Sequence, residues 1–146
     1  MRQRVLLLCT ANVCRSPVAE ALWQAQAQLR KKRLVVTSAG LEALPGQPAD
    51  PVCVELLAAR GLDLSAHRSA RVNLGAAPDQ DLILVMENRH AQRLRAALPV
   101  LRGRVHLLGC WGVGEIADPH GGSRDQYESC IVQIEASVGQ WLDRLK

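Results

Sequence analysis

The sequence contains no phenylalanine, and aromatic residues make up only 3% of its 146 positions. The hydrophobic core must therefore consist mainly of Leu, Val, Ile and Ala. Few aromatic side chains also leave little on which nucleobases can stack, and the net charge is only +4, so we expect no nucleic-acid partner. For the same reason, we expect few aromatic neighbours around Trp23, Trp111, Trp141 and Tyr127.

Long hydrophobic runs and paired cysteines are also missing. The run from Val5 to Cys9 is far too short to span a bilayer, and no signal-peptide cleavage region follows it. The five cysteines are odd in number and lack Cys-x-x-Cys spacing, which argues against a disulfide framework and a structural zinc site. We therefore expect a cytoplasmic protein with reduced thiols and no membrane insertion. Its length and its 48% of hydrophobic residues predict one globular domain, 1–146.

Apolar runs of strand length alternate with segments of helical periodicity. Strands are predicted at 5–9, 34–39, 81–86 and 105–108, and a helical segment follows each of them, the last extending to the end of the chain. Such alternation predicts parallel strands joined by right-handed crossovers. The expected fold is α/β, a three-layer α/β/α sandwich around a four-stranded parallel sheet. The first and last helices are predicted to bury Val18, Leu22, Ala25, Leu29, Tyr127, Ile131, Ile134, Val138, Leu142 and Leu145.

The segment between the first strand and the first helix is predicted to bind phosphate. In sheets of this kind ligands bind beyond the carboxyl ends of the strands. The backbone N–H groups of a loop there can form an anion-binding nest, to which the helix adds its dipole. Arg15 can bind two phosphate oxygens, and the surrounding donors favour a thiolate at Cys9. The other predicted phosphate-binding residues of the loop are Thr10, Ala11, Asn12, Val13, Cys14 and Ser16.

This arrangement predicts that Cys9 is a nucleophile that forms a phosphocysteine, with Ser16 hydrogen-bonded to its sulfur. The alternative is a buried cysteine at a strand end followed by an arginine on the first helical turn. Cys14 lies five residues after Cys9 in one tight loop. We expect it to pack beneath the loop as a small hydrophobe, to form a reversible disulfide with oxidised Cys9, or both.

A poor leaving group needs a general acid, and Asp118 is the best candidate. It lies in a glycine-rich loop and precedes Pro119, which restrains its backbone to an extended shape. Its carboxyl would protonate the leaving oxygen and then accept a proton from the attacking water. Without Cys9 and Arg15, an ordinary Asp-Pro turn would explain the same two residues. The set predicts a phosphomonoester hydrolase that needs no metal or other cofactor, since the nest and Arg15 balance the phosphate charge.

Further segments carry a family signature: Pro17, Glu20, Thr37 to Gly40, Ala49 to Pro51, Ala66 to Arg71 and Asp81 to Met86. With the loop and Asp118-Pro119, they make the chain resemble the low-molecular-weight protein tyrosine phosphatases over essentially its whole length. The resemblance implies a loop-supporting network that holds Asn12 in a left-handed conformation and includes Ser16, Ser38 and His67. Taken alone, His67 would more simply be a surface or capping residue.

Within that family, three features resemble bacterial members paired with exopolysaccharide tyrosine kinases. They are Ser38 to Leu41 before a short proline-containing loop, Met86 to His90, and Arg102-Gly103. The resemblance implies phosphotyrosine proteins as substrates, among them a cognate bacterial tyrosine kinase or exopolysaccharide biosynthesis proteins. We expect the protein to be a monomer.

Two positions depart from the family pattern. Ala11 stands where glycine is usual, so the nest must accept a methyl group. His120 stands where an aromatic residue usually forms one wall of the phenyl slot, and we expect Leu44 to face it. A less aromatic slot should hold phosphotyrosine more weakly.

Other activities fit the sequence less well than this one. The segment 118–123 resembles the protein-arginine phosphatases built on the same scaffold. The resemblance implies, however, that those enzymes have a threonine where this chain has Val13. An arsenate reductase would need two cysteines after His67, and none occurs between Cys53 and Cys110. A catalytically silent phosphotyrosine-binding module would have lost the nucleophile or the acid. A nucleotide-binding P-loop would need Gly-Lys-[Ser/Thr], which is absent. The remaining histidines, His90 and His106, are interpreted as ordinary surface or strand residues.

Overall fold

The computed structural model describes residues 2–145 and alternates strands with helices as predicted. Strand and helix boundaries differ from the predicted ones by a few residues at most. The elements are β1 (Gln3–Cys9), α1 (Arg15–Leu29), β2 (Leu34–Gly40), α2 (Pro51–Ala58), β3 (Leu82–Val85), α3 (Asn88–Ala97), β4 (Val105–Leu107) and α4 (Arg124–Arg144), with short 3-10 helices η1 (Ala77–Asp79) and η2 (Pro99–Leu101).

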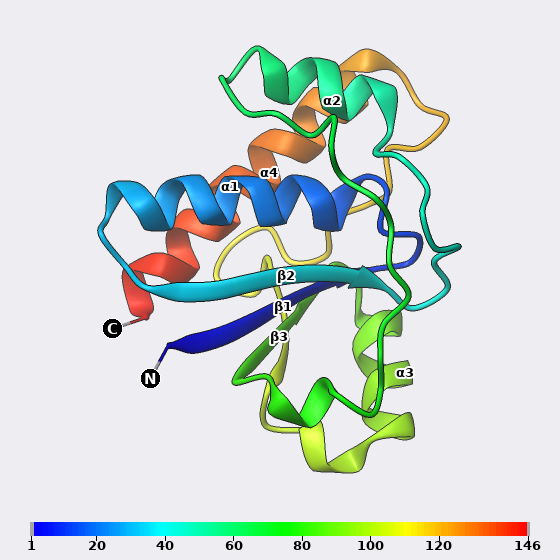
Figure 1. Ribbon diagram of the computed structural model, residues 1–146, viewed down its shortest axis with the longest axis vertical. Helices are drawn as coiled ribbons and strands as arrows, with labels where there is room; N and C mark the ends of the chain where they lie inside the picture. The colour runs from blue at the N-terminus through cyan, green and yellow to red at the C-terminus, as the bar shows by residue number, and fades with distance from the viewer. Residues whose placement is uncertain (1, 146) are drawn as a thin grey trace.

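The four strands form one parallel sheet in the order β2-β1-β3-β4. Helices α1, α2 and α4 cover one face of this sheet and α3 covers the other, so the predicted three layers are confirmed (Figure 1). β1 pairs with β2 on one side and with β3 on the other, so the strand order reverses at β1. Its last residue, Cys9, therefore lies at the switch point where sheets of this type bind ligands.

The sheet is buried on both faces, which explains why its strands are continuous apolar runs. Along β1, Val5 and Leu7 face the layer of α1 and α4, whereas Leu6 and Leu8 face the layer of α3. Asp50 begins α2 as its cap, accepting a hydrogen bond from the N–H of Val52 at 2.9 Å. Within residues 2–145, no helix combines the length and apolarity needed to cross a membrane.

Three details differ from the sequence prediction. Leu29 of α1 is 83% exposed, because it lies two residues, or about 200° of helical rotation, beyond the buried Ala27. Helix α4 ends at Arg144, so Leu145 lies outside the helix, but its partly buried side chain still packs against the core. Trp141 does have aromatic neighbours, since its ring meets that of Trp111 edge-on at 5.6 Å. The fold thus brings together Trp111 and Trp141, which come from separate segments of the chain.

Candidate active site

The loop between β1 and α1 curls around the sulfur of Cys9. The N–H of Asn12 donates to Sγ of Cys9 at 3.3 Å, and Oγ of Ser16 lies 3.0 Å from the same sulfur. Oγ of Ser16 also accepts a hydrogen bond from the Asn12 amide at 2.8 Å, and its single hydrogen can point at the sulfur or at the carbonyl oxygen of Ala39, 3.4 Å away. Both groups lie within hydrogen-bond distance of the sulfur, and the N-terminus of α1 places its dipole beside the loop.

Asn12 sets the shape of this loop. Its φ of 57° lies in the left-handed region, which asparagine enters more readily than most residues. Its buried amide is fully hydrogen-bonded: Nδ2 donates to Ser16 and to Ser38, at 2.8 and 3.0 Å, and Oδ1 accepts from the N–H of Ala70 at 2.9 Å. Contacts from three separate segments thus fix one backbone conformation.

A second group of side chains supports Asn12 from outside. Ser38 donates to Glu20 at 2.6 Å, so its oxygen is oriented to accept from the Asn12 amide. Nε2 of His67 lies 2.8 Å from the carbonyl oxygen of Asn12, and because a carbonyl only accepts, this nitrogen carries the hydrogen. The structure therefore brings Asn12, Ser16, Ser38 and His67 into one network.

Arg15 begins α1 and is 2% exposed. Its Nη1 donates to Oε2 of Glu87 at 2.6 Å and to the carbonyl oxygen of Ile116 at 2.8 Å. These bonds use one guanidinium nitrogen, so the other two remain available for a bound oxyanion. Burial raises the pKa of Glu87, but the hydrogen bonds and charges of Arg15 and Arg89 outweigh it and leave that pKa below its usual range.

His90 is not a surface residue, contrary to the sequence interpretation. It is 2% exposed, and its Nδ1 accepts from the N–H of Glu87 at 3.2 Å, which places the ring hydrogen on Nε2. Nε2 then donates to Oγ1 of Thr10 at 2.9 Å. Burial, with the charges of Arg15 and Arg89, lowers the pKa of His90 to about 4. A neutral imidazole thus braces the start of the loop. His106 lies on β4 as expected.

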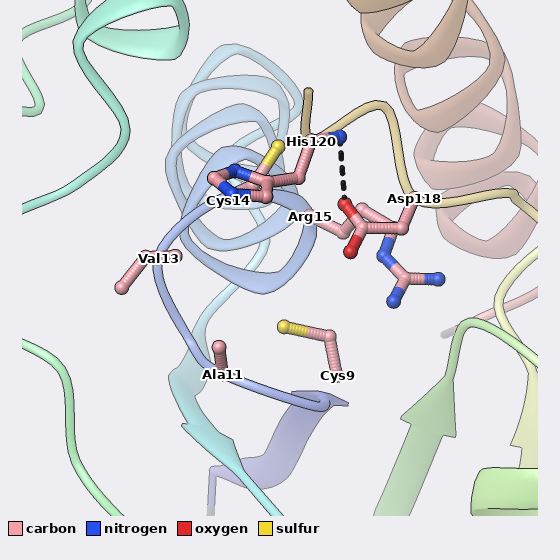
Figure 2. A pocket seen from close by; sticks show the side chains of 7 residues that line it. All are labelled: Cys9, Ala11, Val13, Cys14, Arg15, Asp118 and His120. Carbon is pink, nitrogen blue, oxygen red and sulfur yellow. Dashed lines mark hydrogen bonds between the residues drawn. The ribbon is translucent and has the colours of Figure 1, made fainter. Parts of the chain in front are cut away.

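A cavity of about 130 Å³ opens above the loop (Figure 2). The sulfur of Cys9 and the carboxyl group of Asp118 both point into it, beside the guanidinium of Arg15. Its lining is Cys9, Ala11, Val13, Cys14, Arg15, Asp118 and His120. Leu44, which we expected opposite His120, does not line this cavity and is 72% exposed.

The wall formed by His120 is attached to the body of the protein through Asp50. Nδ1 of His120 lies 3.6 Å from Oδ2 of Asp50, which also accepts a hydrogen bond from the Tyr127 hydroxyl at 2.7 Å. The N–H of Asp50 donates to the carbonyl oxygen of Val13 at 2.7 Å. Asp50 therefore joins the phosphate-binding loop, α2, α4 and the loop of Asp118.

Sequence reasoning missed Glu87 and Asp50 as parts of the site. Glu87 follows β3 directly, at the carboxyl edge of the sheet, and that position was a usable signal. Asp50 carried only the signal of a helix cap, which does not predict its contacts with Tyr127 and His120.

Comparisons with known proteins agree with this geometry. The family model for low molecular weight phosphotyrosine protein phosphatases matches residues 4–146. The protein-tyrosine-phosphatase Wzb of Escherichia coli (strain K12) is 38% identical over 146 residues, which cover 99% of this chain and 97% of Wzb. The structure of Wzb from Escherichia coli K30 in complex with sulphate has a TM-score of 0.89 at 32% identity, with 100% of both chains covered. The YwlE arginine phosphatase of Geobacillus stearothermophilus has a TM-score of 0.88 at 28% identity, covering 97% of this chain and 92% of that one.

Proposed function

Since the chain belongs to the low molecular weight protein-tyrosine-phosphatase family, we propose that it hydrolyses phosphotyrosine in proteins by way of a phosphocysteine on Cys9. The observation that carries this proposal is the convergence of three groups on one cavity. A sulfur set among hydrogen-bond donors, a buried guanidinium and a free carboxyl line the same cavity. These are the nucleophile, the phosphate clamp and the general acid that the reaction needs.

In the first step the Cys9 thiolate attacks phosphorus and the bond to the tyrosine oxygen breaks. The phosphoryl oxygens lie among the N–H groups of the loop and the two free nitrogens of Arg15, which balance the growing negative charge. Asp118 gives its proton to the leaving phenoxide. The products are phosphocysteine, the dephosphorylated tyrosine and an ionised Asp118.

In the second step water attacks the phosphocysteine and Asp118 takes a proton from that water. Inorganic phosphate leaves, and the Cys9 thiolate is regenerated with its hydrogen bond from Ser16. Asp118 is then protonated again, as it was at the start. Cys9 and Asp118 both return to their starting states, so the cycle closes without a cofactor.

The substrates we propose are phosphotyrosine proteins, with a bacterial tyrosine kinase or exopolysaccharide biosynthesis proteins as the physiological targets. Likeness to Wzb supports the branch that the sequence resembles. We expect the protein to act as a monomer in the cytoplasm, where its five free cysteines stay reduced.

Phosphoarginine is the second candidate substrate, because the chain also resembles the YwlE arginine phosphatase. The apolar side chain of Val13 lines the cavity and favours a phenyl ring over a guanidinium. We therefore rank phosphotyrosine first.

The test compares turnover of matched phosphotyrosine, phosphoserine and phosphoarginine peptides by the purified protein without added metal. We expect phosphotyrosine to be hydrolysed fastest and vanadate, which resembles the five-coordinate transition state, to inhibit. Cys9→Ser should abolish turnover and still bind phosphate, because the nest and Arg15 remain. If Cys9→Ser kept more than about a hundredth of the wild-type kcat, the covalent mechanism would be wrong. Faster hydrolysis of phosphoarginine would reverse the substrate assignment alone.

A further inference from the structure

The sulfur of Cys14 lies next to a second sulfur. Sγ of Cys14 is 3.1 Å from Sγ of Cys53, which lies on α2, 39 positions further along the chain. Both thiols are buried, at 6% and 0% exposure. The sequence pointed only to the partnership of Cys14 with Cys9, whereas the folded chain places a third thiol in contact with Cys14.

Cys14 borders both the active-site cavity and the core. It lines that cavity together with Cys9 (Figure 2). Cys53 does not line that cavity and contacts Cys14 from within the core. A cysteine that borders the cavity of Cys9 and contacts the sulfur of Cys53 suits thiol–disulfide exchange. In that reaction a thiolate attacks one sulfur of a disulfide and the other sulfur leaves.

The three thiols differ in their reactivity towards hydrogen peroxide. The hydrogen bond with Cys53 and burial raise the pKa of Cys14 far above its usual range. A thiol held in its protonated form reacts poorly, so Cys14 is not the first target of an oxidant. Cys9, with donors from Asn12 and Ser16 and an open cavity in front of it, is that target.

We propose that Cys14 and Cys53 form an oxidative modification site, in which oxidation at Cys9 is passed inward and ends as a Cys14–Cys53 disulfide. The proposal rests on the nucleophilic Cys9 of the proposed function. Hydrogen peroxide first oxidises the Cys9 thiolate to a sulfenic acid and is itself reduced to hydroxide. The Cys14 thiol then displaces the sulfenic oxygen, so that a Cys9–Cys14 disulfide forms and water is released. Finally, the Cys53 thiol gives its proton to the hydroxide formed in the first step, which becomes water, and attacks Sγ of Cys14, which breaks the first disulfide and expels Cys9 as a thiolate.

The last step runs in this direction because of the leaving group. The Cys9 thiolate is stabilised by the Asn12 N–H and the Ser16 hydroxyl, and a stabilised thiolate leaves faster than a buried one without donors. The product leaves Cys9 free while Cys14 and Cys53 hold the disulfide. The enzyme would therefore keep its nucleophile after a single oxidation, and the sulfenic acid would not progress to the irreversible sulfinic acid.

Cys130 of α4 supplies a matched control. It is a buried core cysteine at 5% exposure, and burial, with the nearby Cys14 thiol, raises its pKa to about 12. Among residues 2–145 it has no sulfur at hydrogen-bond distance. Cys130→Ala removes a buried thiol of the same kind without touching the proposed route.

The experiment treats the full-length protein with equimolar hydrogen peroxide, alkylates free thiols in denaturant and maps disulfides by mass spectrometry. Wild type and Cys130→Ala should yield the Cys14–Cys53 disulfide and keep phosphatase activity without added thiol. Cys53→Ala should instead accumulate the Cys9–Cys14 disulfide and lose activity until dithiothreitol is added. Cys53→Val, which fills the site, should behave in the same way and guards against a folding defect in the alanine variant.

Two outcomes would overturn the proposal. One is wild type that stops at Cys9–Cys14 with Cys53 fully alkylated. The other is a Cys14–Cys53 disulfide that forms equally well in Cys9→Ser, because the oxidation would then not pass through Cys9. Disulfide mapping needs no turnover. If the untreated protein hydrolysed no phosphoester, the proposed function would be wrong. The mapped disulfides would still show whether oxidation passes from Cys9 to Cys14 and Cys53.

Discussion

One carboxylate holds the guanidinium that we propose as the phosphate clamp. Arg15 is nearly fully buried, and Glu87 is its only acidic partner among the ion pairs of residues 2–145. Glu87→Gln keeps the shape of the side chain but removes its charge. We expect kcat/KM for phosphotyrosine peptides to fall about tenfold and the free energy of unfolding to fall by roughly 2 kcal/mol, the scale of a charged hydrogen bond.

Glu42→Gln is the matched control, because Glu42 also pairs with an arginine at 2.7 Å but both side chains are half exposed. An exposed pair of this kind contributes less than about 1 kcal/mol, so both measured quantities should stay near wild type. Equal effects of the two substitutions would show that Glu87 does not orient Arg15.

The lowered pKa of Glu87 also predicts a pH dependence. A depressed carboxyl pKa stabilises the folded protein above the unfolded value of about 4.3, and this stabilisation is lost as the pH falls through the folded value. The difference in melting temperature between wild type and Glu87→Gln should therefore be full near pH 7 and shrink below about pH 4. A difference that stayed constant with pH would contradict the ion-pair explanation.

Asp118 is exposed in the cavity, where, among residues 2–145, its Oδ1 accepts only the N–H of His120, at 3.0 Å. Asp118→Ala should reduce kcat strongly, by about a hundredfold or more, for phenyl phosphates with poor leaving groups. It should affect much less those esters whose leaving group needs no proton. The measurement is kcat against the leaving-group pKa for both proteins. Equal losses across the series would make Asp118 a turn residue and leave the general acid to be found elsewhere.

At the scale of elements, the phosphate-binding loop rests directly on the end of β2. Gly40 pairs with Cys9 across the sheet, and a Cβ added there would lie 2.6 Å from the carbonyl oxygen of Thr10. Because that oxygen belongs to the backbone, it cannot move without moving the loop. The close approach of the two chains explains why glycine stands at this position.

Gly40→Ala should therefore displace the loop, weaken binding of inorganic phosphate and lower the free energy of unfolding by about 1–3 kcal/mol. Gly103→Ala is the control, because a Cβ at Gly103 meets no atom within 4 Å and its φ is not positive. Phosphate affinity by calorimetry and urea unfolding measure the two effects. Unchanged phosphate binding in Gly40→Ala would mean that the loop does not depend on this contact.

At the scale of the whole molecule, the slot above the phosphate is built from distant parts of the chain. Val13 comes from the first loop and His120 from the last, and Asp50 connects them through its bonds to Val13 and its contact with His120. We expect a phosphate nest at the bottom of such a slot to be reached by the long tyrosine side chain and not by serine. Substrate choice is thus a property of the assembled fold.

His120→Tyr should add an aromatic wall and lower KM for aryl phosphates, with kcat little changed, because ground state and transition state share the added contact. Steady-state kinetics on phosphotyrosine peptides measure this, with His120→Ala expected to raise KM. In a parallel substitution, Val13→Thr should shift preference towards phosphoarginine. If KM did not respond to either change at His120, the side chain would not form a wall of the substrate slot.

The sequence by itself determined the order of strands and helices and the place of the site within it. Apolar runs and helical periodicity are local patterns, so they predict local structure. The loop from Cys9 to Ser16 is contiguous, and its chemistry could be inferred from residue types and spacing alone. Loop-supporting residues such as Ser38 and His67 came from the family resemblance, and the structure places both against Asn12.

The tertiary structure alone decided which distant side chains meet. Glu87 reaches Arg15 across 72 positions and Cys53 reaches Cys14 across 39, and no periodicity or spacing encodes such contacts. His90, interpreted as a surface residue, is buried because α3 turns it towards Thr10. Leu44 lies outside the cavity because the path of its loop depends on the elements around it. Contacts between remote segments depend on how helices pack on the sheet, which only the folded chain fixes.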